Sequence, residues 1–134
     1  MTVLVLLAMV IIGGGAGAML RLLITRWSIK HHGSDFPWGT LLVNLGGALL
    51  IGLLAGFLVP YSMFDGGEPL PALLIYGLLG SYTTVSTLSL EWLLLVRRGR
   101  ARAGWIYLGV SLAGGLLLVV IGLAMGTVVA GRLS

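Results

Sequence analysis

The sequence predicts an all-α membrane protein of four transmembrane helices, the third of which is broken at mid-membrane. Of its 134 residues, 58% are hydrophobic and 9% are charged, whereas a soluble domain carries about 25% charged residues. Four long apolar segments each reach the roughly 20 residues that a helix needs to cross a bilayer. The third segment holds small and hydroxyl residues at positions 80–87. Hydrocarbon tolerates such a run only where it faces protein or water, so we expect a polar feature that serves passage across the membrane.

The segments predict a single transmembrane domain over residues 1–134, with spans at about 2–24, 38–59, 71–96 and 105–130. The connections are then 25–37, 60–70 and 97–104. No Lys or Arg precedes the first apolar run, which argues against a signal peptide. Cysteine is absent, which excludes disulfides and thiolate metal sites. The two histidines, His31 and His32, are adjacent and fall in a predicted loop, so nothing indicates an enzyme.

Basic residues gather at one predicted side of the membrane. Seven of the eight are on that side, and Arg132 is on the other; the seven are Arg21, Arg26, Lys30, Arg97, Arg98, Arg100 and Arg102. The second connection carries Asp65 and Glu68 instead. The positive-inside rule therefore predicts a multi-pass protein of the cell (inner or plasma) membrane with both termini outside. This bias accounts for the net charge of +4 without nucleic acid.

Tryptophan and glycine add two structural expectations. The four tryptophans, Trp27, Trp38, Trp92 and Trp105, all fall at the basic interface, where indole rings anchor helices at headgroup level. Small residues recur every four positions in three spans, at Gly13 and Gly17, at Ala48, Gly52 and Gly56, and at Gly122 and Gly126. This spacing predicts closely packed helix pairs.

A few polar side chains remain inside the second and fourth spans. Asn44 follows Thr40 by one helical turn, and its amide is equally suited to bonding a neighbouring helix or to lining a pore. Tyr107, Ser111 and Gly115 are spaced by four and share one face of the fourth span. The two hydroxyls there form a weak polar stripe.

The third span carries the strongest signal. Its hydroxyl residues are Ser81, Thr83, Thr84, Ser86 and Thr87, beside Gly77 and Gly80. A helix broken here would leave carbonyls able to hold a small cation such as Na⁺; a continuous helix with hydroxyls bonded to the preceding turn is the alternative. Glu91 is the sole acid within the spans, and we expect it to form an ion pair with Arg21 or another interfacial arginine.

Neutral donors without acids near mid-membrane favour an anion as the transported species, although hydroxyl and amide oxygens also bind cations. Four motifs, in order, then resemble the CrcB/Fluc fluoride channels over nearly the whole chain. They are residues 14–21 (GGAGAMLR), residues 36–47 (FPWGTLLVNLGG), residues 77–91 (GLLGSYTTVSTLSLE), and Tyr107 with Ser111 and Gly114.

The resemblance implies an antiparallel dimer with two fluoride pores, passive fluoride export, and one structural Na⁺ at the dimer centre. The backbone carbonyls of Gly80 and Thr83 would hold the Na⁺. Asn44 would donate to fluoride, and the other candidate pore residues are Thr40, Thr84, Val85, Thr87, Leu88, Tyr107 and Ser111. Charge-assisted hydrogen bonds would replace the water of a strongly hydrated ion.

The chain departs from the family pattern at three positions. Val85 and Leu88 stand where the family usually has phenylalanines, and aliphatic side chains lack the positive edge of an aromatic ring. Gly115 replaces a second pore hydroxyl.

The basic bias also suggests insertion in one orientation, so we expect pairing with an oppositely oriented paralogue; a homodimer is the alternative.

Two rival functions remain at this point. A non-conducting partner subunit would tolerate Val85, Leu88 and Gly115. A small multidrug-type transporter resembles the chain in size, but such proteins carry a glutamate in the first helix, and residues 2–24 contain no acid.

Overall fold

The computed structural model describes residues 3–58 and 69–133, which are helical apart from short connections. Three spans are single helices: α1 (Val3–His32), α2 (Trp38–Leu58) and α6 (Ala101–Leu133). The other comprises α3 (Pro69–Pro71), the π-helical segment η2 (Ala72–Leu79), α4 (Gly80–Tyr82) and α5 (Val85–Arg97). All four are long and apolar enough to cross a membrane, as the sequence predicts. Residue 2, the predicted end of the second span at Val59, and Asp65 and Glu68 lie outside the described residues.

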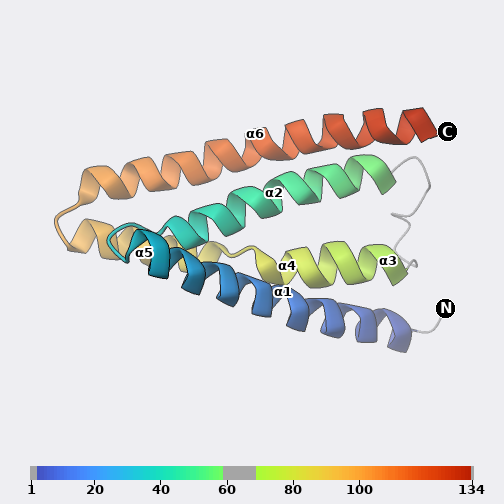
Figure 1. The fold of residues 1–134 in the computed structure, drawn as a ribbon, viewed down its shortest axis with the longest axis horizontal. Helices are drawn as coiled ribbons and strands as arrows, with labels where there is room; N and C mark the ends of the chain where they lie inside the picture. The colour runs from blue at the N-terminus through green and yellow to red at the C-terminus, as the bar shows by residue number, and fades with distance from the viewer. Residues whose placement is uncertain (1–2, 59–68, 134) are drawn as a thin grey trace.

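The helices associate in two pairs. Figure 1 shows α2 beside α6 and α1 beside the segments of the third span, and the contacts between elements agree. Both described ends of the chain lie at one end of the bundle, and the α1–α2 and α5–α6 connections lie at the other. An even number of antiparallel spans produces this arrangement.

Glycine explains why α2 and α6 approach so closely. A Cβ atom added at Gly52 would overlap the carbonyl oxygen of Val119, and one at Gly122 would overlap the carbonyl oxygen of Leu49. Gly56 and Gly126 face the partner backbone in the same way. The predicted packing role of these glycines is therefore confirmed, because backbone meets backbone with no side chain between.

Two connections are shorter than predicted. α1 continues to His32, so His31 and His32 occupy its last turn, and their predicted loop position is wrong. A helix satisfies its own backbone hydrogen bonds, so it extends past the apolar span until Gly33 (φ 77°) ends it. At the other connection, Gly99 (φ 75°) follows α5, and α6 already begins at Ala101.

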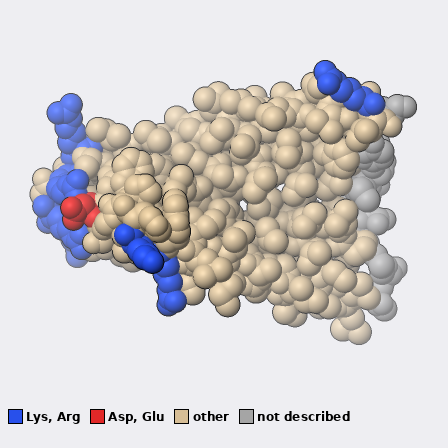
Figure 2. All heavy atoms as spheres, in the orientation of Figure 1, with Lys and Arg blue, Asp and Glu red and all other residues tan. Residues whose placement is uncertain are grey.

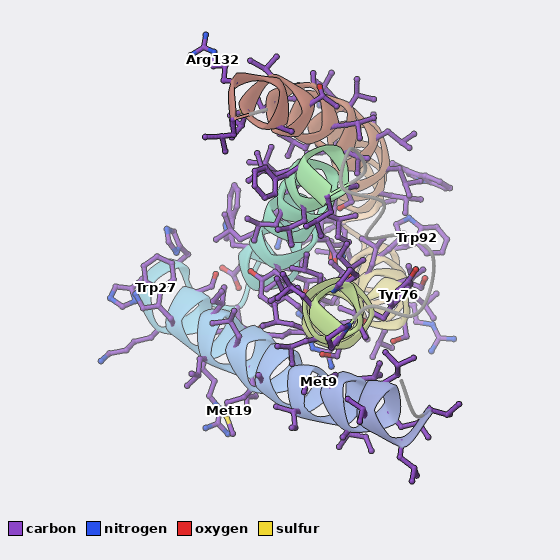
Figure 3. All side chains as sticks on the ribbon, turned by 90° about the vertical axis from the view of Figure 1, so that its right-hand side faces the viewer. Met9, Met19, Trp27, Tyr76, Trp92 and Arg132 are labelled. Carbon is purple, nitrogen blue, oxygen red and sulfur yellow. The ribbon has the colours of Figure 1, made fainter. Side chains whose placement is uncertain are left out.

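Most side chains of the spans face outward. Between 11% and 33% of the residues in each apolar window are buried, which leaves a wide apolar surface for lipid. Figure 3 shows Met19 pointing away from the other helices, and the residue is 57% exposed. In Figure 2 the Lys and Arg side chains gather at one end, apart from Arg132 at the opposite end. The predicted clustering of basic residues is thus present in three dimensions.

Candidate functional site

Two residues of extended backbone separate α4 from α5. Thr83 has φ −78° and ψ 156°, and Thr84 has φ −153° and ψ 127°. Asn44 of α2 lies against this segment: its Oδ1 accepts from the backbone N–H of Thr84 at 2.8 Å, and its Nδ2 donates to the carbonyl of Thr84 at 2.8 Å. Asn44 therefore bonds across helices to backbone, which was one of its two predicted roles. One of its two N–H groups stays available to a further acceptor.

The hydrogen bonds around Thr84 leave two carbonyls without their helical donors. In an uninterrupted α-helix, Thr84 N would donate to Gly80 O, and Thr87 N would donate to Thr83 O. Here Thr84 N donates to Asn44, and Thr87 N donates to Thr84 Oγ1 at 3.3 Å, as at a helix N-cap. The carbonyl oxygens of Gly80 and Thr83 are the two that the resemblance implies as ligands of Na⁺. Unpaired backbone oxygens at a helix interruption suit a small hard cation, so the residues fit that ion.

The other hydroxyls of this region bond locally or to α1. Thr83 Oγ1 donates to Leu79 O at 3.1 Å, and Thr84 Oγ1 lies 3.2 Å from Ser86 Oγ and 3.2 Å from Thr87 Oγ1. Ser81 Oγ donates to Gly14 O at 2.7 Å, which ties α4 to α1. The segment is thus held from both neighbouring spans.

Glu91 does not pair with Arg21, and the predicted ion pair is wrong. Its two carboxylate oxygens accept instead from Thr40 Oγ1 at 2.9 Å and from Tyr107 OH at 2.7 Å. Thr40 and Tyr107 are almost fully buried, and Glu91 is half-buried. The three side chains come from α2, α5 and α6, so they form a polar clasp among three helices. The relative register of α2, α5 and α6 brings these two hydroxyl groups, and no arginine, within bonding distance of the carboxylate.

Ser111 lies one turn beyond Tyr107 on α6. It is 7% exposed, and its Oγ is buried with no hydrogen-bond partner among the described residues. A buried hydroxyl without a partner is costly. Trp92 Nε1 is likewise buried without a hydrogen-bond partner among the described residues. Its indole ring packs against Trp105, with ring centroids 5.1 Å apart.

The structure separates the two residues that replace the family phenylalanines. Val85 is 74% exposed at the start of α5. Leu88 is 4% exposed and packs with Leu41, Leu95 and Tyr107. Of these two side chains, therefore, only Val85 is available to a partner chain.

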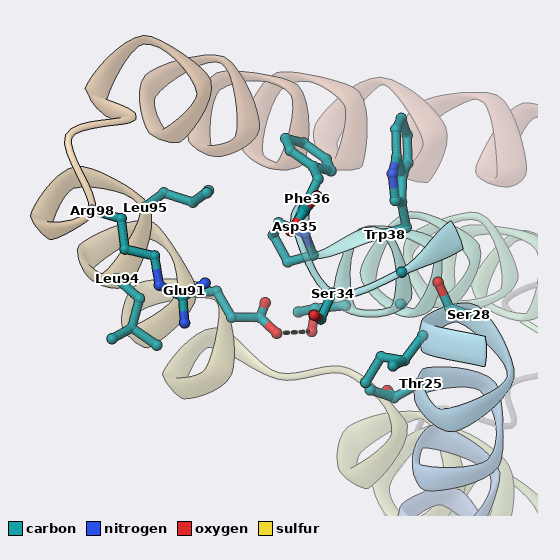
Figure 4. A pocket seen from close by; sticks show the side chains of 15 residues that line it. Thr25, Ser28, Ser34, Asp35, Phe36, Trp38, Glu91, Leu94, Leu95 and Arg98 are labelled. Carbon is teal, nitrogen blue, oxygen red and sulfur yellow. Dashed lines mark hydrogen bonds between the residues drawn. The ribbon is translucent and has the colours of Figure 1, made fainter. Parts of the chain in front are cut away.

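Two cavities border this region. One, of about 150 Å³, lies under the α1–α2 connection; Figure 4 shows Glu91 of α5 and Arg98, which follows α5, on one side of it and Thr25 and Ser28 of α1 on the other. The second, of about 390 Å³, is lined by Ala18, Arg21, Leu22, Thr25, Thr40, Thr84 and Thr87. Arg21 therefore shares a cavity with the threonines and is not bonded to the Glu91 carboxylate.

Thr25 and Thr40 line both cavities. Thr25 and Ser28 were not among the predicted site residues. Their positions carried a signal, because Arg21, Thr25 and Ser28 are spaced by four and three and so share one helical face.

The chain was compared with known proteins. Residues 8–123 match the family model described as CrcB-like protein, Camphor Resistance (CrcB). Three similar proteins bear the name fluoride-specific ion channel FluC. The protein from Rhizobium johnstonii is 41% identical over 87% of this chain and 92% of its own; that from Novosphingobium aromaticivorans is 42% identical over 88% and 93%; that from Xanthomonas euvesicatoria is 43% identical over 85% and 84%.

Proposed function

The chain belongs to the CrcB-like family, and from that premise we propose that it is a subunit of a fluoride-selective channel for passive fluoride export. The relatives named above support the choice of fluoride. The chemistry of the described site supports it too, because Asn44, Thr84, Thr87 and Ser111 carry neutral groups that can donate hydrogen bonds. A small anion that loses its water needs such donors.

Ser111 is the observation that carries the proposal. Its hydroxyl is buried without a partner in the described part of the subunit, while nearly all buried polar groups in proteins have one. An ion in transit would supply the missing acceptor. Tyr107 lies one turn away, and the free N–H of Asn44 would offer a second donor.

The cavity of about 390 Å³ is the proposed entrance. It places Arg21 within one space with Thr40, Thr84 and Thr87. A guanidinium group at that position raises the local concentration of anions. Thr84, which lines the same cavity, is bonded through its backbone to Asn44. We propose this cavity as the approach from the basic end, which the positive-inside rule assigns to the cytoplasm, with both termini outside.

The channel is proposed to be an antiparallel dimer. The apolar Val85, 74% exposed beside the interruption, and the exposed Gly80 leave this part of α4 and α5 open to a partner. Two such segments meeting at the dimer centre would bring four backbone carbonyls together, from Gly80 and Thr83 of each subunit. A Na⁺ held there would be coordinated by these oxygens and would join the subunits.

The partner is proposed to be a paralogue of opposite orientation. Seven of eight basic residues favour one side of the membrane, so one chain inserts one way. The paralogue would supply the aromatic ring edges that Val85 and Leu88 lack.

The test is fluoride efflux from liposomes, measured with a fluoride electrode. We expect the chain co-purified with an adjacent-gene paralogue to release fluoride but not chloride, and the chain alone to release little. Full selective efflux from the lone chain would favour a homodimer. Absence of efflux from both preparations would overturn the fluoride-channel proposal.

A non-conducting partner subunit is the second candidate. Leu88 favours it, because this side chain is buried in the subunit core and lines neither cavity. Ser111→Ala distinguishes the two: loss of efflux from the co-purified complex indicates that this chain conducts, and unchanged efflux indicates a scaffold.

A further inference from the structure

We infer that Asn44 and the Thr84 hydroxyl are positioning residues that keep the Gly80 and Thr83 carbonyls exposed by taking the N–H groups that would otherwise pair with them. The two side chains act on different carbonyls. Asn44 accepts from Thr84 N, which would donate to the Gly80 carbonyl in a continuous helix. Thr84 Oγ1 accepts from Thr87 N, which would donate to the Thr83 carbonyl. Each carbonyl of the proposed cation site therefore has its own side chain that releases it.

Asn44 holds Thr84 from a different span. Its amide accepts from Thr84 N and donates to Thr84 O, both at 2.8 Å, so one side chain satisfies both backbone groups of one residue. A backbone group left unpaired inside a bilayer is costly. In the extended conformation at Thr84, α2 thus provides the acceptor that replaces the helical partner of the Thr84 N–H. α2 itself packs closely on α6 through glycine contacts.

Thr84 is also the N-cap of α5. Its Oγ1 accepts from Thr87 N, and a threonine at this position favours the start of a helix. Because the cap restarts the helix at Val85, the Thr83 carbonyl has no donor from the first turn of α5. Removing either side chain should let the corresponding i to i−4 hydrogen bond form again.

Backbone conformation provides the first test, which depends on neither fluoride nor sodium. Protein labelled with ¹³C and ¹⁵N threonine would be measured in liposomes by solid-state NMR. We expect extended-type Cα shifts at Thr83 and Thr84 in the wild type, and a helical shift at Thr84 in Asn44→Leu, which keeps the side-chain shape and removes both hydrogen-bonding groups. Should Asn44→Leu not fold, Asn44→Ala replaces it.

Two matched variants sharpen the result. Asn44→Asp keeps an oxygen acceptor for Thr84 N, so we expect an extended shift at Thr84. Thr84→Val, measured with valine labelled as well as threonine, removes the cap but keeps the backbone bonds to Asn44, so position 84 should remain extended while the amide shift of Thr87 changes. An extended Thr84 in both Asn44→Leu and Asn44→Ala would overturn the inference.

Sodium provides the second test, and this part rests on the proposed function. Thermal unfolding of the dimer would be compared in sodium chloride and in choline chloride. We expect sodium to raise the melting temperature of the wild type and of Asn44→Asp, and to have no effect on Asn44→Leu. A full sodium effect in Asn44→Leu would contradict the positioning role. A wild type insensitive to sodium would overturn the proposed cation site, while the chemical shifts still decide the role of Asn44.

Discussion

The α2–α6 contact and the α4–α5 interruption are both close approaches between spans, yet they are built in opposite ways. At the first, Gly52 and Gly122 bring two backbones together, and each backbone keeps its own helical hydrogen bonds. At the second, Asn44 of another span replaces the helical acceptor of the Thr84 N–H and also donates to the Thr84 carbonyl. The first contact needs only the absence of side chains, whereas the second needs particular side-chain atoms. Packing and polar chemistry are thus assigned to different places along the same helix, α2.

The largest loss of stability is expected from Gly122→Val. The added Cβ would overlap the carbonyl oxygen of Leu49. Overpacking typically costs about 1–3 kcal/mol and occasionally more, and because backbone atoms are met here we expect a loss above about 3 kcal/mol. Unfolding in detergent mixtures by steric trapping would measure it. Gly109→Val is the control, since a Cβ there meets no atom within 4 Å. Equal destabilisation by both variants would show that the glycine contact does not determine the pairing of α2 and α6.

A smaller loss is expected from Tyr107→Phe. The change removes the hydroxyl that donates to Glu91 Oε2 at 2.7 Å, and leaving a buried partner unsatisfied costs about 1–3 kcal/mol. Because the ring is retained, its contact with Phe36 at a centroid distance of 5.6 Å should persist. The same unfolding measurement checks the prediction, with Tyr76→Phe as the control at a 56% exposed position. A loss no greater than that of the control would argue against a stabilising clasp.

Ser81→Ala should cost less again. Its hydroxyl donates to Gly14 O across the α1–α4 contact, and interhelical hydrogen bonds in membranes average about 0.6 kcal/mol. Ser89→Ala, which removes an exposed bond within α5, is the control. We expect the control to have the higher free energy of unfolding; the reverse order would indicate that Ser81 contributes nothing across the helices.

Ser111→Ala should change stability least and transport most. The Ser111 hydroxyl has no partner among the described residues, so its removal breaks no hydrogen bond there and should not lower the free energy of unfolding. Under the proposed function, fluoride efflux should fall by at least about tenfold, equivalent to roughly 1.4 kcal/mol for one lost donor. A strongly destabilised protein would instead reveal a structural bond from Ser111 to a partner chain.

The sequence predicted what depends on local periodicity. Apolar length identified the four spans, and four-residue spacing identified Gly52 and Gly122 as contact residues. Neither pattern contains the register of one helix against another. For that reason Glu91 was assigned to an arginine, whereas Thr40 and Tyr107 bind it.

The boundary of α1 was missed for a different reason. Apolar content reports where hydrocarbon ends, but a helix satisfies its own hydrogen bonds in water as well. α1 therefore continued to His32 until a glycine with positive φ stopped it. The pair of hydrogen bonds between Asn44 and Thr84 could not be predicted from the sequence either, because it joins residues 40 positions apart.

Backbone-to-backbone contact between α2 and α6 has one more consequence. Two helices joined through Gly52, Gly56, Gly122 and Gly126 have no side chains between their backbones at these contacts to rearrange, so we expect them to move together. Asn44 belongs to one helix of that pair, and Tyr107 and Ser111 belong to the other. We therefore expect their mutual spacing to stay constant; under the proposed function, a gating motion would be made by α1 and the third span.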